Sequence, residues 1–328
     1  MIAVLFTLLI SVILCGAYLR LARHWQLLDE PNSRSSHLAP TPHGGGVALM
    51  LAFMLGLLLA NRLYGGWSGA VTTLSISALI LTGLGILDDL RGLSVRLRLL
   101  TYAIVCLWVA SALLPETGAE HAIGWVLLVC VIAIAMLWVV NLYNFMDGID
   151  GIAAMQTILA CCGAALIAFI WEQETGYALF CLLLAAAHGG FLVWNYPPAR
   201  LFMGDAGSVP TGILLAGLAL LGAVEGQINP LCWLVLLAGF ITDASLTLIW
   251  RIGTGQAFMQ PHRQHAYQRL SRYWKSHSKV DAWFVVINVL WLLPLACAVQ
   301  AWPKINLFLV LLAYLPLVFG MVKTARLS

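Results

Sequence analysis

The sequence contains very little charge. Charged residues make up 9% of its 328 positions and hydrophobic residues 62%, whereas soluble domains ordinarily carry about 25% charged residues. A water-soluble fold of this size cannot bury so much apolar surface, so a soluble domain is excluded. The formal net charge of only +3 also gives no basis for a nucleic-acid partner.

Cysteine patterns typical of metal sites and disulfide frameworks are absent as well. No CxxC pair occurs, and all eight cysteines lie within apolar runs. This placement predicts small buried hydrophobic side chains.

The N-terminal run lacks the marks of a cleaved signal peptide. Residues 1–19 contain no basic residue and no small-residue cleavage site, and Arg20 and Arg23 follow the run. This pattern predicts a first transmembrane helix whose N-terminus lies outside the cytoplasm.

Apolar runs of membrane-spanning length fill the rest of the chain. The sequence predicts an all-α integral membrane protein, a polytopic bundle of about 10–11 transmembrane helices forming a single domain, residues 1–328. The predicted spans cover residues 2–21, 45–64, 68–87, 98–115, 122–141, 152–171, 177–194, 208–223, 230–250, 281–301 and 305–322. The cytoplasmic loops cover residues 22–44, 88–98, 142–151, 195–207 and 251–280.

The charged residues are distributed unequally between the two predicted faces. All lysines and arginines except Arg62 and Lys304 fall at ends assigned to the cytoplasm, which fits the excess of positive charge on that side of membrane proteins. All the aspartates fall on the same side, but most glutamates fall on the other. We therefore expect a periplasmic N-terminus and an active site on the cytoplasmic face that handles metal and phosphate.

The most polar stretch between two spans is Asn141-Leu-Tyr-Asn-Phe-Met-Asp-Gly-Ile-Asp-Gly151, hereafter the acidic segment. An aspartate at mid-membrane costs roughly 2.5–3.5 kcal/mol, so this segment should lie at a membrane face. Asp147 and Asp150 share one side if the backbone is helical. The alternatives are a metal- and phosphate-binding site and an ordinary polar interfacial loop.

Two further cytoplasmic elements carry glycine or paired acids. Gly44, Gly45 and Gly46 open the second span, where backbone N–H groups favour anions; a plain connector is the alternative. Asp88 and Asp89 end the third span and repel each other unless a cation or a proton intervenes. Ion pairs with the arginines that follow them are the alternative reading.

Polar residues also occur near the later spans. Asp205 lies between two glycines just before a span, where it can face a ligand or cap the helix. Asp243, near the cytoplasmic end of the ninth span, is predicted to be functional. His188, within the seventh span, is predicted to be a hydrogen-bonded interhelical histidine.

The last large loop is basic. It contains His262, Arg263 and His265, followed by further basic and aromatic residues. These three side chains suit a pyrophosphate, whereas the loop as a whole could instead lie on anionic lipid.

Taken together, these elements resemble the polyprenyl-phosphate N-acetylhexosamine-1-phosphate transferases, glycosyltransferase family 4. The acidic segment resembles the family's NxxNxxDGxDG signature, and Phe202-Met-Gly-Asp-Ala-Gly-Ser208 is similar to its FMGDxGS element. Asp88-Asp89, Asp243, the Arg263-Gln-His265 run and the first loop from Asp29 to Gly46 resemble weaker motifs. The likeness extends from Asp29 to about Tyr267.

The resemblance implies a reaction and its participants. A sugar-1-phosphate would pass from a UDP-N-acetylhexosamine to undecaprenyl phosphate in the bacterial inner membrane, with release of UMP. Mg²⁺, or Mn²⁺ in its place, would be the cofactor, and a homodimer is left open. Direct attack of the lipid phosphate is favoured over a covalent aspartyl intermediate.

The resemblance also implies roles for single residues. Catalytic residues would be Asp88, Asp89, Asp147, Asp150 and His265. Metal ligands would be Asp205 and Asp147. Substrate-binding residues would be Asn141, Asn144, His262, Arg263, Gly44, Gly45 and Asp243.

One departure bears on the sugar. The family's HxHH run is reduced here to His265-Ala-Tyr-Gln268. The chain thus resembles the subgroup that initiates O-antigen and lipopolysaccharide synthesis with UDP-GlcNAc or with 6-deoxy sugars such as UDP-FucNAc and UDP-QuiNAc. The rival prediction is a membrane transporter with an acidic cation or substrate site, although transporters ordinarily place such groups near the midplane and show internal repeats.

Overall fold

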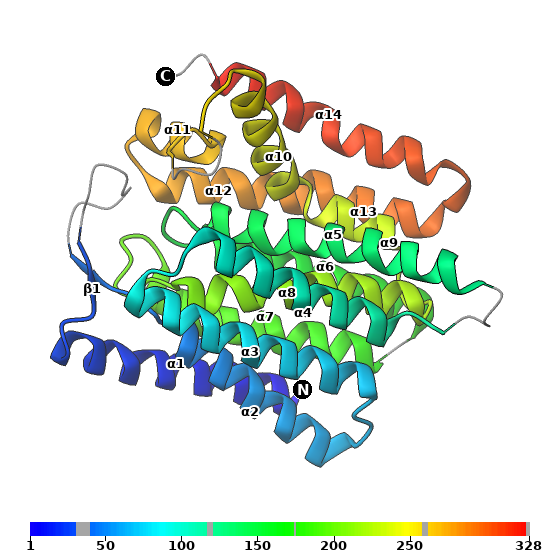
Figure 1. The fold of residues 1–328 in the computed structure, drawn as a ribbon, viewed down its shortest axis with the longest axis horizontal. Coiled ribbons are helices and arrows are strands. Elements are labelled where there is room, and N and C mark those ends of the chain that lie inside the picture. Colours follow the sequence, from blue (N-terminus) through cyan, green and yellow to red (C-terminus); the bar gives the residue numbers. More distant parts are fainter. Residues whose placement is uncertain (31–39, 117–120, 174, 258–261, 326–328) are drawn as a thin grey trace.

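The computed structural model describes residues 1–30, 40–116, 121–173, 175–257 and 262–325, and these residues are mostly helical (Figure 1). The long helices are α1 (Ile2–His24), α2 (Gly46–Tyr64), α3 (Gly69–Arg91), α4 (Val95–Leu113), α5 (Ala122–Met146), α6 (Ile152–Glu172), α7 (Thr175–Asn195), α8 (Asp205–Val224) and α14 (Asn306–Thr324). The shorter elements are β1 (Leu28–Asp29), β2 (Thr41–Pro42), α9 (Pro230–Leu236), α10 (Ala238–Gly253), α11 (Ala266–Trp274), α12 (His277–Ile287), the π-helix η2 (Asn288–Leu292), α13 (Leu293–Ala301) and the 3₁₀-helix η3 (Pro303–Ile305).

The predicted fold class is confirmed. Within the described ranges, ten helices are long and apolar enough to cross a membrane, or eleven if α9 and α10 form one bent span. The first loop adds only a two-residue antiparallel pairing of β1 with β2. The part of that loop from Pro31 to His37 that resembles the family lies outside the described residues.

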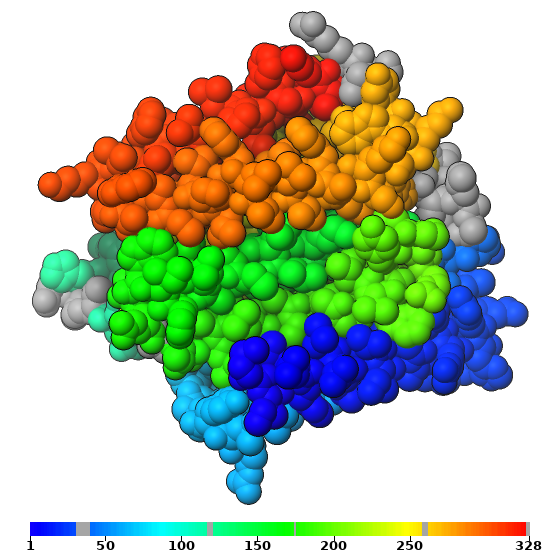
Figure 2. All heavy atoms as spheres, turned by 180° about the vertical axis from the view of Figure 1, so that it is seen from behind, coloured from blue at the N-terminus to red at the C-terminus, as the bar shows by residue number. Residues whose placement is uncertain are grey.

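Helix α8 is the centre of the bundle. Of its most apolar window 83% is buried, against 17% for α14, and it packs against α2, α3, α4 and α5. Figure 2 shows α6 and α7 lying between α1 and the α12–α13 layer on the opposite face of the molecule. An outer ring of apolar helices around α8 suits a lipid environment.

Glycines allow the closest helix contacts at the start of α8. A side-chain carbon on Gly46 of α2 would overlap the backbone nitrogen of Gly207, and one on Gly85 of α3 would lie 2.5 Å from Ala206 Cα. Small residues bring membrane helices together in this way. The first turn of α8 is therefore held at backbone contact by two neighbouring helices.

The predicted ninth span is not a single straight helix. The chain bends by 72° between α9 and α10, so the span predicted over residues 230–250 consists of two helices. The bend is accommodated by the buried Gln156 of α6, whose Nε2 donates to the Leu236 carbonyl at 3.0 Å. A carbonyl released from its helix within a membrane needs such a partner.

Two smaller predictions have different outcomes. His188 is fully buried, with Nδ1 2.9 Å from the Leu184 carbonyl and Nε2 3.1 Å from Thr211 Oγ1, so the predicted interhelical histidine is confirmed. The prediction that all cysteines are buried was wrong, because Cys130 and Cys162 are exposed on α5 and α6. Both lie within apolar spans, where exposure means contact with lipid.

Polar elements gather at one end of the bundle. The links α1–α2, α3–α4, α5–α6 and α7–α8 all return to the end where β1 and α11 lie (Figure 1). Each of these links carries one of the predicted acidic or glycine-rich elements, so antiparallel packing brings residues far apart in sequence to one face.

Candidate active site

Asp89 fastens the beginning of α8. Its carboxylate accepts the backbone N–H of Asp205 at 3.0 Å and that of Ala206 at 3.2 Å. The first N–H groups of a helix have no partner within the helix, and a carboxylate there also interacts favourably with the helix dipole. Asp89 therefore positions Asp205 through its backbone.

Asp88 points to a different set of partners. It accepts the Leu93 N–H at 2.6 Å and lies 2.7 Å from an Arg98 guanidinium nitrogen. The same nitrogen lies 3.2 Å from Asp205. Ion pairing with a nearby arginine, the alternative interpretation of the aspartate pair, is thus confirmed for Asp88, and Arg98 links it to Asp205.

The two asparagines of the acidic segment differ in role. Asn144 Nδ2 donates to Asp205 at 2.8 Å and to Ser208 Oγ at 2.9 Å, so it joins α5 to the first turn of α8. Asn141 Nδ2 instead donates to the Leu137 carbonyl of its own helix at 2.7 Å. Only Asn144 is brought into direct contact with the carboxylate cluster.

Asp147 follows the last turn of α5, near the other acids of the site. Burial raises the pKa of the Asp147 carboxyl to about 7, and the negative charges of Asp89 and Asp150 act in the same direction. Within the described residues, its carboxylate makes no hydrogen bond that would occupy it. A crowded acid of this kind is suited to a cation, which would relieve the repulsion.

Asp150 and Gly151 fix the far end of the acidic segment. Asp150 accepts the Ala199 N–H at 3.0 Å and lies 3.2 Å from Nδ1 of His277. Gly151 has a φ of +82°, which glycine adopts readily, and its N–H donates to the Asn195 side chain at 2.9 Å. The segment is therefore tied to the α7–α8 link and to α12.

The glycine run of the first loop has a packing role. The N–H groups of Gly45 and Gly46 donate to the carbonyls of Phe202 and Met203 at 2.9 and 2.8 Å. These donors were predicted to favour an anion, but they are already hydrogen-bonded to the α7–α8 link. Gly44, with a φ of +84°, lies against Tyr18.

Asp243 fastens α11 in the way that Asp89 fastens α8. It is 6% exposed and accepts the N–H groups of Ala266 and Tyr267 at 2.9 and 3.0 Å. Nδ1 of His265 lies 3.1 Å from the same carboxylate. Asp243, predicted to bind substrate, here contacts only the histidine loop and Thr247 among the hydrogen bonds of the described residues.

The remaining residues of that loop form a stack. The His262 ring lies over the His265 ring with centroids 4.9 Å apart. Burial lowers the pKa of the His262 imidazole to about 4, and the neighbouring His265 and Arg251 act in the same direction. His262 is therefore uncharged at neutral pH. The backbone carbonyl of Arg263 accepts a guanidinium N–H of Arg272 at 3.0 Å.

The two residues that depart from the family's histidine run contact the acidic segment. A side-chain carbon on Gly148 would lie against the Tyr267 hydroxyl and 3.0 Å from Gln268 Nε2, and that hydroxyl donates to the Phe145 carbonyl at 3.0 Å. Tyr267 and Gln268 therefore lie directly beside the segment that carries the predicted catalytic residues Asp147 and Asp150.

Several site residues were not predicted from the sequence. Arg98 was predicted only as one of the arginines that could pair with Asp88 and Asp89, and its link to Asp205 was not predicted. Ser208 lies within the FMGDxGS element, so its motif could have identified it. His277 and the buried Asp281 begin an apolar run, and an acid in that position is a signal in itself.

The donor set fits a cation that shares its ligands with a substrate. Among the described residues, no three His, Cys, Asp or Glu side chains are arranged to hold a metal by themselves. Mg²⁺ is commonly bound by one or two carboxylates together with substrate phosphates. Asp205 and the open Asp147 carboxylate match that requirement.

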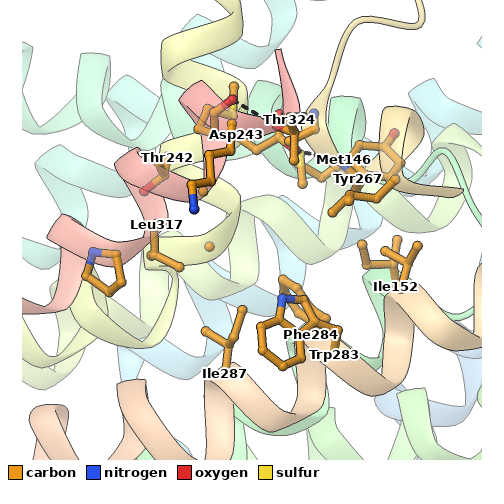
Figure 3. A pocket seen from close by; sticks show the side chains of 18 of the residues that line it. Met146, Ile152, Thr242, Asp243, Tyr267, Trp283, Phe284, Ile287, Leu317 and Thr324 are labelled. Atoms are coloured by element: carbon orange, nitrogen blue, oxygen red, sulfur yellow. Dashed lines mark hydrogen bonds between the residues drawn. The ribbon is translucent and has the colours of Figure 1, made fainter. Parts of the chain in front are cut away.

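An apolar pocket of about 500 Å³ adjoins the acidic segment. Its walls include Met146 and Ile152, which flank the polar part of that segment, and Tyr267. Side chains of α12 such as Ile287 face Leu317 of α14 across it (Figure 3). The pocket thus extends from the acidic segment between α10, α11, α12 and α14.

Comparison with known proteins gives matches over most of the chain. The sequence model described as glycosyl transferase family 4 matches residues 71–223. A probable undecaprenyl-phosphate N-acetylglucosaminyl 1-phosphate transferase of Bacillus subtilis is 28% identical over 288 residues, 84% of this chain and 78% of the relative. A decaprenyl-phosphate N-acetylglucosaminephosphotransferase of Mycobacterium leprae is 27% identical over 308 residues, which make up 83% of this chain and 75% of the relative. A phospho-N-acetylmuramoyl-pentapeptide-transferase of Listeria monocytogenes is 27% identical over 234 residues, which make up 65% of this chain and 68% of the relative.

Proposed function

This chain belongs to glycosyl transferase family 4, and we propose that it transfers an N-acetylhexosamine-1-phosphate from a UDP-sugar to undecaprenyl phosphate, releasing UMP. The observation that carries the proposal is the meeting of Asp88, Arg98, Asn144 and Asp205 at one end of the bundle. The acidic segment that carries Asn144 also borders, at Met146, a pocket of mostly apolar side chains. A charged site for phosphates and an apolar site for a lipid chain are thus neighbours.

In this reaction an oxygen of the lipid phosphate attacks the phosphorus that carries the sugar. The bond from that phosphorus to the oxygen bridging to UMP breaks, and UMP leaves with the electron pair. Several negative charges meet in the transition state, so catalysis consists mainly of positioning and neutralising phosphates.

The proposed cofactor is Mg²⁺, or Mn²⁺ in its place, held by Asp205 and Asp147. When bound, it would neutralise phosphate oxygens and stabilise the leaving UMP. Asn144 orients the Asp205 carboxylate by its hydrogen bond, and Asp89 fixes the backbone of the same residue. Arg98 supplies a fixed positive charge between the two carboxylates.

The other candidates divide into contacts and supports. Asp88 would contact or deprotonate the lipid phosphate. To do so it would have to give up its ion pair with Arg98. Arg263 and His265 would hold the pyrophosphate, with His262 acting as a neutral hydrogen-bonding group. Asp150 and Asp243 hold their segments by accepting backbone N–H groups.

The apolar pocket is the proposed place of the polyprenyl chain near its phosphate. Its lining is mostly apolar, and Met146 and Ile152 lie at the acidic segment. A lipid chain lying there would direct its phosphate toward Asp147. In the proposed reaction the acceptor lies in the bacterial inner membrane and the donor arrives from the cytoplasm.

The proposed sugar is GlcNAc or a 6-deoxy N-acetylhexosamine such as FucNAc or QuiNAc, and the proposed process is the initiation of O-antigen or another surface polysaccharide. The relatives named for N-acetylglucosamine support the N-acetylhexosamine class. The contact of Tyr267 and Gln268 with Gly148 supports a difference in sugar preference, because these side chains replace two histidines of the family run.

Turnover by purified protein tests this proposal. In detergent with undecaprenyl phosphate and Mg²⁺, we expect one sugar of a UDP-N-acetylhexosamine panel to give UMP and a labelled lipid product in equal amounts. EDTA should abolish both products, because the described residues offer no complete protein ligand set, and added Mg²⁺ should restore them. Folded protein that gives neither product with any sugar would contradict the proposal and favour a transporter.

Substitution of Asp88 by asparagine should lower the transfer rate by about a hundredfold or more, since an electrostatic catalytic contact contributes about that much. The amide retains the volume of the native side chain but cannot form the ion pair with Arg98. Initial rates with saturating UDP-sugar measure the effect. A rate within a few-fold of the native value would remove Asp88 from the mechanism.

A further inference from the structure

The first turns of α12 carry His277 and Asp281, which lie against the Asp150–Gly151 end of the acidic segment. Neither residue has a part in the proposed reaction. Both nevertheless lie against the segment that carries Asp147, so their polar groups call for a physical explanation.

The Asp281 carboxyl is buried without a hydrogen-bond partner. The residue is 2% exposed, and neither oxygen has a donor within the described part of the chain. A side-chain carbon on Gly151 would lie 3.1 Å from Asp281 Oδ2, so the carboxyl faces the end of the acidic segment. An apolar residue of the same size would fill this place at lower energetic cost.

His277 lies one helical turn before Asp281 on α12 and contacts Asp150 of the acidic segment. His277 Nδ1 lies 3.2 Å from the Asp150 carboxylate and 3.4 Å from the Asp150 backbone nitrogen. With a proton on Nδ1 the imidazole donates to the carboxylate; without one it accepts the backbone N–H. His277 therefore remains attached to Asp150 in either state.

We propose that Asp281 and His277 are positioning residues, which hold the Asp150–Gly151 end of the acidic segment so that Asp147 faces the substrates. The Asp281 carboxyl lies against Gly151, and His277 holds Asp150 on its α12 side. The Ala199 N–H and the Asn195 side chain hold the same end from the α7–α8 link. For its catalytic consequence this inference rests on the proposed function.

Amide hydrogen exchange tests the inference without any substrate. In detergent-solubilised full-length protein, Asp281→Asn, Asp281→Leu and His277→Gln should each speed exchange in peptides covering 147–151, because local protection follows local stability. The double variant Asp281→Asn/His277→Gln should exchange no faster than the faster single variant, as expected for residues that act as one unit. Lys279→Gln, an exposed position on the same helix, should match the native protein.

Kinetics supply the readout that a merely structural role would not move. We expect kcat to fall about tenfold in each single variant, since small displacements of a catalytic group have effects of this size or larger, while KM for the UDP-sugar changes little. Native exchange together with native kcat in Asp281→Leu would overturn the inference, as would fully additive effects in the double variant. Faster exchange in a protein whose native form makes no lipid product would refute the proposed function and leave the positioning role standing.

Discussion

Asp205→Asn should reduce the transfer rate by about a thousandfold or more, equivalent to roughly 4 kcal/mol of transition-state stabilisation. The native carboxylate receives both Asn144 and Arg98 and is the proposed metal ligand. Asparagine has the same shape but no negative charge, so both the cation and the arrangement of Arg98 should be affected. Initial rates measured over a Mg²⁺ series give the magnitude.

The fold should survive this substitution. Asp205 begins α8, and loss of a charge that interacts with a helix dipole costs only about 0.3–1 kcal/mol. Gel filtration and thermal unfolding in detergent check this, and Glu225→Gln, which removes a carboxylate at the other end of α8, serves as the control. Transfer at near-native rate by the asparagine variant would exclude Asp205 as a metal ligand.

Gly85→Ala should nearly abolish transfer although residue 85 touches no proposed substrate. The new carbon would lie 2.5 Å from the backbone atoms of Asp205 and Ala206, and backbone cannot move aside as a side chain can. Relief of the clash would displace α8 by about an ångström, and such a displacement can cost about a hundredfold in rate. We expect a lower unfolding temperature as well.

Gly83→Ala on the same helix provides the matched control. Nothing lies within 4 Å of a carbon added there, and alanine is favoured over glycine within a helix by about 0.5–1 kcal/mol. Native activity with equal or higher thermal stability is therefore expected. Equal loss of activity in both variants would indicate a general effect of alanine on α3 and would contradict the packing argument.

The spans were largely predictable because a membrane helix is defined by length and hydropathy alone. The predicted run 152–171, for example, corresponds to α6, Ile152–Glu172. The break between α9 and α10 was not predictable in this way, and the Gln156 amide that binds the Leu236 carbonyl beside it comes from a different helix. Hydropathy contains no information on such a contact.

Motifs identified the elements of the site more reliably than the role of each side chain. The family predicted from them is confirmed by the matches to known proteins. Asp88 and Asp89 are adjacent and chemically identical, yet one pairs with Arg98 and the other holds α8. Successive helix positions point in different directions, so their roles depend on neighbours that the sequence does not locate.

The ion pairs of Arg98 have a consequence for the order in which ligands bind. When ionised, the carboxylates of Asp88 and Asp205 share a single guanidinium, and the Asp89 carboxylate lies beside them against backbone N–H groups. One positive charge among these three carboxylates leaves two negative charges without a partner of opposite sign. A site of that sign repels a pyrophosphate. In the proposed reaction, positive charge must therefore arrive before the sugar nucleotide or together with it. A cation that neutralises the carboxylates raises the affinity of the site for the nucleotide, and the bound nucleotide raises the affinity for the cation by the same factor.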